Sequence, residues 1–184
     1  MNLEPGHFPM GEPLAFFLTW TTYGTWLPGD ERGWVEKPGQ FRAPDAQRRE
    51  SAQHLMTEPA LTLEVEQRQI VEDTIAEHCR IRGWHLHTVS ARTQHVHVVV
   101  TASGMDPKIV MDQFKAWCTR RLKARQRACQ SYETPLRQNW WTQGGSKRWL
   151  NDSTSLFEAI RYVSEGQGEP TPRPIAEEKQ RTQA

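Results

Sequence analysis

Residues 93–101, Thr-Gln-His-Val-His-Val-Val-Val-Thr, place two histidines one residue apart within a run of β-branched side chains. Such a run predicts a β-strand. Alternate side chains of a strand share a face, so we expect His95 and His97 to point to one side and Val96 to point into a core on the other. Neutral imidazole is the commonest metal ligand. Two imidazoles on a rigid strand therefore predict a metal-binding pair.

The preceding segment predicts the partner of this strand. Residues 84–91 alternate as a strand, and a tight turn near residues 92–93 would join the two into a hairpin. This segment holds a second His-x-His, His85 and His87. Because Leu86 and Val89 do not share a face of a regular strand and the flanks are polar, we interpret the second pair as lying on a solvated face.

The other expected elements follow from hydrophobic spacing and helix-end signals. Thr62 is expected to cap a helix that begins at Leu63 and ends at Gly83, with Val65 on its buried face. The remaining predicted elements are a strand at 14–23, a helix at 107–128 with Ile109 and Trp117 on its apolar stripe, short strands at 139–142 and 147–150, and a helix at 155–163 preceded by capping residues at 151–153.

Composition indicates one domain with extensions. The chain of 184 residues has 36% hydrophobic residues, and its mean hydropathy is −0.75. No stretch reaches the roughly 18 apolar residues of a membrane span, and no signal peptide is recognisable, so we expect a cytoplasmic protein without membrane contact. The three cysteines lack CxxC spacing and are expected to be free thiols.

Proline and glycine divide the chain into a domain and three less regular segments. We expect a flexible leader at 1–13, a domain at 14–167 and a polar, mobile tail at 168–184. Residues 24–60 predict a long irregular insertion with a short helix near 46–55. Trp26 and Trp34 within it either stack on bases or pin the insertion to the domain.

Charge is concentrated in one helix. The net charge is only +1, yet residues 108–127 contain seven basic residues and one acid. Such a local field attracts polyanions. The residues expected to contact DNA phosphates in this helix and on the strand at 147–150 are Lys115, Arg120, Arg121, Lys123, Lys147 and Arg148.

The ordered motifs resemble those of the IS200-like and REP-associated tyrosine (Y1) transposases, members of the HUH superfamily of single-strand DNA nucleases. The matching pieces are Gln94-His95-Val96-His97-Val98-Val99-Val100, then Met111-Asp112-Gln113-Phe114-Lys115, then Ala159-Ile160-Arg161-Tyr162-Val163. The resemblance covers about residues 14–167.

The resemblance implies an α+β, ferredoxin-like antiparallel sheet with helices packed on one face. It also implies a divalent metal ion, Mg²⁺ or Mn²⁺, held by His95, His97 and an oxygen from the late helix. Tyr162 would attack a phosphodiester of single-stranded or hairpin DNA, leaving a 5′-phosphotyrosine that a second hydroxyl can reverse. The implied activity is that of a transposase, an endonuclease that cleaves and rejoins element ends.

The sequence departs from the family at the third metal ligand. Relatives carry an amide four residues after the tyrosine, whereas here that position is Gly166 and the amide is Gln167. Five residues correspond to about 140° around an ideal helix, so Gly166 must end the helix or admit a bulge for Gln167 to reach the metal. We favour Gln167, with Glu165 as the competing ligand.

Several alternatives stay open. Tyr23 and Tyr132 are weaker nucleophile candidates, and a homodimer could supply Tyr162 from a partner chain. A domesticated, non-cleaving protein that binds hairpin DNA is one other function. A zinc hydrolase or metal-storage domain is another, although no additional Cys or His ligands support a structural zinc site.

Overall fold

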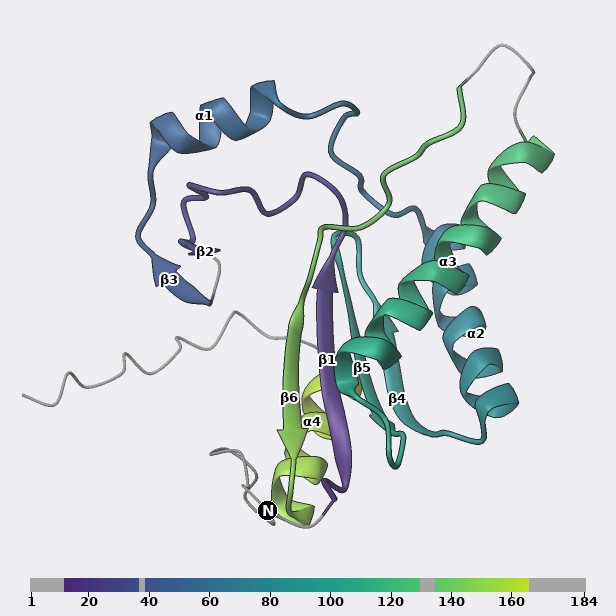
Figure 1. The fold of residues 1–184 in the computed structure, drawn as a ribbon. Coiled ribbons are helices and arrows are strands. Elements are labelled where there is room, and N and C mark those ends of the chain that lie inside the picture. Colours follow the sequence, from purple (N-terminus) through teal and green to yellow (C-terminus); the bar gives the residue numbers. More distant parts are fainter. Residues whose placement is uncertain (1–11, 37–38, 130–134, 166–184) are drawn as a thin grey trace, which may run out of the picture.

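The computed structural model describes residues 12–36, 39–129 and 135–165 (Figure 1). The expected tail at 168–184, most of the expected leader at 1–13, and two candidate residues, Tyr132 and Gln167, lie outside these ranges.

A four-stranded antiparallel sheet forms the centre of the fold, in the order β4-β5-β1-β6. Its strands are β1 (Ala15–Thr21), β4 (His85–Ala91), β5 (His95–Thr101) and β6 (Ser146–Leu150). Helix α2 (Val65–Arg82) connects β1 to β4, and α3 (Pro107–Cys129) connects β5 to β6. This βαββαβ order, with each helix crossing over one intervening strand, is the ferredoxin-like arrangement. The expected α+β fold is confirmed.

The main core lies between the sheet and α2 and α3, which lie side by side (Figure 1). Even-numbered residues of β1 and β5 face these helices, among them Trp20, Val96 and Val98, each at most 1% exposed. Phe114 and Ile75 meet them from α3 and α2. The alternation predicted for the His95 strand is thus present, and it directs the odd-numbered residues to the opposite face.

Helix α4 (Ser153–Ser164) covers that opposite face. Ala159 and Val163 of α4 pack on Ala15, Val99 and Leu150 of the sheet. Figure 1 shows α4 behind the strands, with α2 and α3 on the other side. The structure thus adds to the expected single helical layer a late helix that packs on the sheet of its own chain.

The helix ends follow local signals, with one correction. Gly83 ends α2 with a φ of +68°, a conformation that favours glycine. Asp152 caps α4 by accepting a hydrogen bond from the Ser155 backbone. The prediction that Thr62 caps α2 was wrong: Glu64 is the cap, because it and Gln67 form a reciprocal capping box. Val65, in the first turn, is 74% exposed rather than buried.

The insertion at 24–60 is more ordered than expected. The predicted short helix is α1 (Ala46–His54), and a small hairpin of β2 (Trp34–Glu36) and β3 (Gln40–Arg42), not foreseen from the sequence, precedes it. Trp26 Nε1 donates to the Gly33 carbonyl. Trp34 is 8% exposed beneath the Arg48 guanidinium. Both tryptophans therefore hold the insertion together.

The segment before β6 is fixed to the end of the insertion. The Glu58 carboxylate accepts hydrogen bonds from the backbone of Gln138 and Asn139. The Arg137 guanidinium donates to the Pro59 carbonyl. The short strand predicted at 139–142 was wrong: this stretch forms only an isolated bridge between Thr22 and Trp141.

The prediction of free cysteines is confirmed. The three cysteines are free; burial raises the pKa of the Cys79 thiol to about 12, and it also raises the pKa of Cys118. Within residues 12–36, 39–129 and 135–165, no helix has the length and apolar character to cross a membrane.

Candidate active site

Two imidazoles lie together on the face of the sheet that α4 covers. The ring centroids of His95 and His97 are 4.7 Å apart, with the rings inclined at 72°. His97 is 6% exposed, whereas His95 is partly exposed. The two rings thus lie together on one face of the sheet, as the alternation predicted, and their binding of one metal ion stays a prediction.

A threonine on the neighbouring strand orients His97. Thr19 is directly opposite His97 in the β1–β5 register, and its Oγ1 lies 2.8 Å from His97 Nδ1. In the tautomer with a proton on Nδ1, the ring donates to the hydroxyl, and Nε2 keeps its lone pair for a metal. Sequence reasoning missed Thr19 because its role depends on the pairing of two strands 78 residues apart.

Tyr162 of α4 lies beside this pair in the same chain. Its ring centroid is 5.8 Å from that of His97, and the rings are nearly perpendicular. Phe17 contacts both rings, at 5.6 Å from His97 and 6.0 Å from Tyr162. The tyrosine is 42% exposed, whereas its neighbour Val163 anchors the helix in the sheet. The phenol is therefore both held near the imidazoles and accessible.

The other tyrosine that the structure describes has a different environment. The Tyr23 hydroxyl accepts a hydrogen bond from the Thr57 backbone and thus ties β1 to the end of the insertion. The ring of Tyr162, by contrast, lies 5.8 Å from that of His97, so Tyr162 is the better nucleophile candidate.

A third metal ligand is not defined by the described residues. Gln167 lies outside them, and Glu165 is the C-cap of α4, close to Tyr162 in one pocket. In the part of the chain that the structure describes, no cluster of three or more His, Cys, Asp or Glu residues could hold a metal. Two neighbouring imidazoles are nevertheless a donor pair that a divalent transition metal accepts, and the metal stays a prediction. Because Mg²⁺ prefers oxygen ligands, they suit Mn²⁺ better.

A pocket of about 660 Å³ opens beside Tyr162, between α4 and the β1–β6 half of the sheet. The residues that line it are Phe17, Arg148, Glu158, Ala159, Arg161, Tyr162 and Glu165. Arg148 is opposite Phe17 in the β1–β6 register. Of the six residues expected to contact DNA, Arg148 is the one that lines this pocket.

Lys115 has a structural environment. Its ammonium group donates to the Thr142 carbonyl at 2.9 Å and to the Gly144 carbonyl. Burial lowers the pKa of Lys115 to about 8, so the amine is still protonated at neutral pH. Lys147, nearby, donates to the Gly145 carbonyl. The contacts of Lys115 are better explained by support of the segment before β6 than by the expected phosphate contact.

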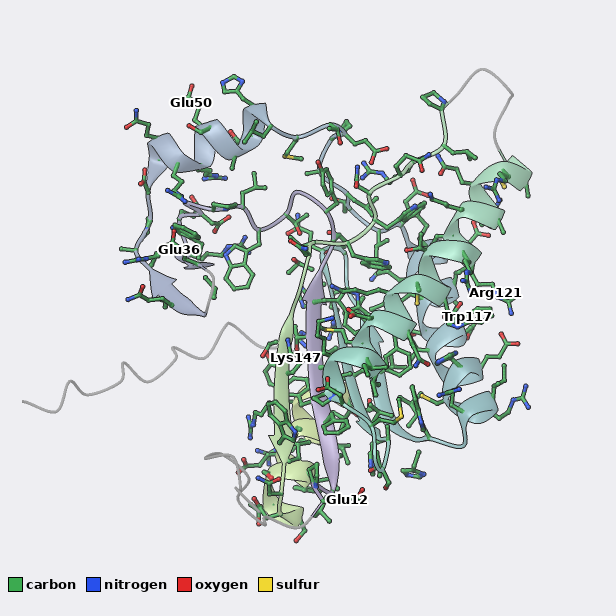
Figure 2. All side chains as sticks on the ribbon, viewed as in Figure 1. Glu12, Glu36, Glu50, Trp117, Arg121 and Lys147 are labelled. Carbon is green, nitrogen blue, oxygen red and sulfur yellow. The ribbon has the colours of Figure 1, made fainter. Side chains whose placement is uncertain are left out.

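The remaining basic residues lie on the helical layer across the sheet from Tyr162. Arg121 pairs with Glu77 of α2 at 2.6 Å, and Figure 2 shows it on α3, on the side away from the strands. Arg120 stacks on the ring of Trp117. Trp117 and Ile109 were expected on the buried apolar stripe of this helix, but they are 41% and 48% exposed. Lys123 donates to Gln138. The sequence could not show that α3 and Tyr162 lie on opposite faces.

The second histidine pair lies at the other end of the hairpin. His85 is opposite Thr101, and His87 occupies a bulge where its Nε2 lies 2.9 Å from Thr101 Oγ1. Burial lowers the pKa of His87, and the adjacent His85 lowers it further. His85 is exposed, as expected for a solvated face, whereas His87 is half-buried.

Two solved structures are similar to this chain. One is a REP-associated tyrosine transposase bound to a REP hairpin, with 12% identity, a TM-score of 0.46, and coverage of 88% of this chain and 70% of the other. The second is a candidate transposase from Deinococcus radiodurans R1, with 12% identity, a TM-score of 0.42, and coverage of 90% and 97%. The sequence matches no protein-family model and no curated protein. These values are too low to transfer a function, which we argue from the site itself.

Proposed function

We propose that this chain is a metal-dependent single-strand DNA endonuclease and strand transferase of the Y1 transposase type, with Tyr162 as its nucleophile. The observation that carries the proposal is the position of the Tyr162 ring, 5.8 Å from His97 and accessible from a pocket. A phenol beside a metal-binding imidazole pair is the arrangement that nucleophilic attack on a phosphodiester needs.

The residues divide the work as follows. His95 and His97 would hold a divalent cation, with an oxygen from the end of α4, and when bound this cation would offset charge that develops on the phosphate. Thr19 Oγ1 would accept a hydrogen bond from His97 Nδ1 in the tautomer whose Nε2 can bind a metal. Phe17 packs against both rings and helps to hold Tyr162 beside His97.

The reaction would exchange one phosphodiester for another. The Tyr162 Oη–P bond forms and the P–O3′ bond of the strand breaks, while the phenolic proton leaves and the 3′ oxygen takes up a proton. The product is a 5′-phosphotyrosine and a free 3′-hydroxyl. A second 3′-hydroxyl can attack the same phosphorus and release the tyrosine, so strands are rejoined without a separate energy source.

The resemblance of the motifs suggests hairpin-bearing element ends as the substrate, and the insertion at 24–60, next to β1, is a candidate surface for the structured part of the DNA. Exchange of this insertion for a short linker would then weaken discrimination between hairpin and unstructured DNA. Unchanged discrimination would exclude this role.

The experiment is detection of the covalent adduct by denaturing gel and mass spectrometry, with a labelled single-stranded oligonucleotide and Mn²⁺. The wild-type chain and Tyr23→Phe should form the adduct, and Tyr162→Phe should not. An adduct that persists in Tyr162→Phe would exclude this nucleophile. Hairpin binding without cleavage in any divalent metal would select the non-cleaving alternative, and tight zinc binding without DNA affinity would select a zinc protein.

A further inference from the structure

Two arginines reach the Tyr162 pocket from different elements. Arg148 comes from edge strand β6, and Arg161 comes from α4, one residue before Tyr162. Both side chains are exposed. Within residues 12–36, 39–129 and 135–165, neither forms an ion pair with a carboxylate. Their charges are available to a ligand of the pocket.

The basic residues of α3 differ in this respect. Arg121 pairs with Glu77 at 2.6 Å, Arg125 with Glu66 at 2.7 Å, and Lys108 with Asp112 at 2.7 Å. A cation that already has a carboxylate partner gains less from a phosphate. The largest sequence cluster of positive charge is therefore partly neutralised and lies on the far face of the sheet. Arg148 and Arg161, at the pocket, form no ion pair with a carboxylate of the described residues, and both lie beside the nucleophile.

The pocket has the size and lining for one nucleotide. Its volume of about 660 Å³ lies within the range of small-molecule sites, roughly 300–1,000 Å³. Phe17 and Ala159 supply apolar surface for a sugar or base, and the guanidinium groups can each form two parallel hydrogen bonds with a phosphate. The carboxylates of Glu158 and Glu165 also line it and can accept hydrogen bonds from amino groups on a base edge.

We infer that this pocket is a subsite for the nucleotide next to the phosphate presented to Tyr162, and that Arg148 and Arg161 each contact one backbone phosphate of the single strand. The inference rests on the proposed function, since it assigns the substrate of the same site. It differs from the sequence-based expectation in assigning the backbone contacts to the pocket arginines rather than to the basic helix α3.

The salt dependence of binding tests this inference. Fluorescence anisotropy of a labelled single-stranded oligonucleotide, with EDTA to prevent cleavage, gives the slope of log K against log salt concentration. Each phosphate contact contributes about 0.7 to this slope for single strands. Arg148→Gln and Arg161→Gln should each reduce the slope by about 0.7, and the double variant should reduce it by about 1.4. Arg148→Lys, which keeps the charge, should keep the slope and confirm an intact fold.

The matched control is Arg121→Gln, which removes one charge from α3 and should leave the slope unchanged. Unchanged slopes in both pocket variants, an equal decrease in Arg121→Gln, or no oligonucleotide binding by the wild type would each overturn the inference.

The adduct assay separates this result from the proposed function. In one outcome, neither the wild type nor any variant forms an adduct with Mn²⁺, and only the pocket variants show a smaller salt dependence of binding. The subsite then stands and the catalytic proposal fails. If the adduct forms at Tyr162 and the pocket variants keep their slope, the catalytic proposal stands and the subsite is wrong.

Discussion

Replacement of Thr19 by valine tests whether the imidazole pair is a metal site. Valine keeps the β-branched shape in β1 and removes only the hydroxyl that lies 2.8 Å from His97 Nδ1. Loss of one hydrogen bond should lower the free energy of unfolding by about 1 kcal/mol. Loss of a contact that orients a metal-binding histidine should weaken metal affinity about 10- to 100-fold, which corresponds to about 1.4–2.8 kcal/mol.

The assay is a titration of Mn²⁺ followed by calorimetry, with the Mn²⁺ dependence of adduct formation as a second readout. Thr101→Val is the matched control, because it removes a hydroxyl at a similar distance, 2.9 Å, from the imidazole of His87 on the same face of the sheet. It should leave Mn²⁺ affinity unchanged. Equal Mn²⁺ affinity in Thr19→Val and the wild type, with both folded, would refute the role assigned to Thr19 and His97.

Three further predictions concern stability, each measured by urea unfolding. Gly83→Ala should lower the free energy of unfolding by about 1–2 kcal/mol, because the residue has a left-handed φ of +68°. An added Cβ meets no atom within 4 Å, so the whole cost should come from the backbone conformation. An unchanged free energy of unfolding would show that the backbone there relaxes. Partial burial raises the pKa of Glu58, but hydrogen bonds donated by the Gln138 and Asn139 backbone outweigh this effect and lower the pKa. The wild type should therefore be more stable than Glu58→Gln above about pH 5, and the difference in free energy of unfolding should shrink as pH falls. A difference that does not change with pH would contradict the contact. Burial lowers the pKa of Lys115 to about 8, so between about pH 8 and pH 10 the amine is protonated in the unfolded chain but not in the folded chain. The free energy of unfolding of the wild type should therefore rise with pH in this interval relative to that of Lys115→Met. The same pH dependence in both proteins would exclude a buried ammonium.

Local sequence signals were sufficient for most of the fold. The alternation around His95 and His97 predicted both the strand and the face that each residue occupies, because the side-chain period of a strand is two. Gly83 and Asp152 marked the ends of α2 and α4, since a left-handed C-cap and a side-chain N-cap depend on adjacent residues. The family resemblance supplied the ferredoxin-like arrangement of these elements and the candidate nucleophile.

What sequence reasoning missed depends on contacts between distant residues. Thr19 could not be connected to His97 without the register of β1 on β5. Lys115 and Arg121 looked similar in the sequence, but one supports backbone carbonyls and the other pairs with Glu77. Val65 is apolar at helical spacing yet exposed, because position within the first turn, not periodicity, decides its surroundings.

The central claim is that Tyr162 and the two imidazoles form one metal-dependent site. The chain has three tyrosines, so incorporation of 3-fluorotyrosine gives three ¹⁹F resonances, which Tyr-to-Phe variants assign. Paramagnetic Mn²⁺ should broaden the Tyr162 resonance at low occupancy and leave that of Tyr23 sharp, and His97→Ala should abolish the effect. A Tyr162 resonance that stays sharp at saturating Mn²⁺, or broadens no more than that of Tyr23, would contradict the account.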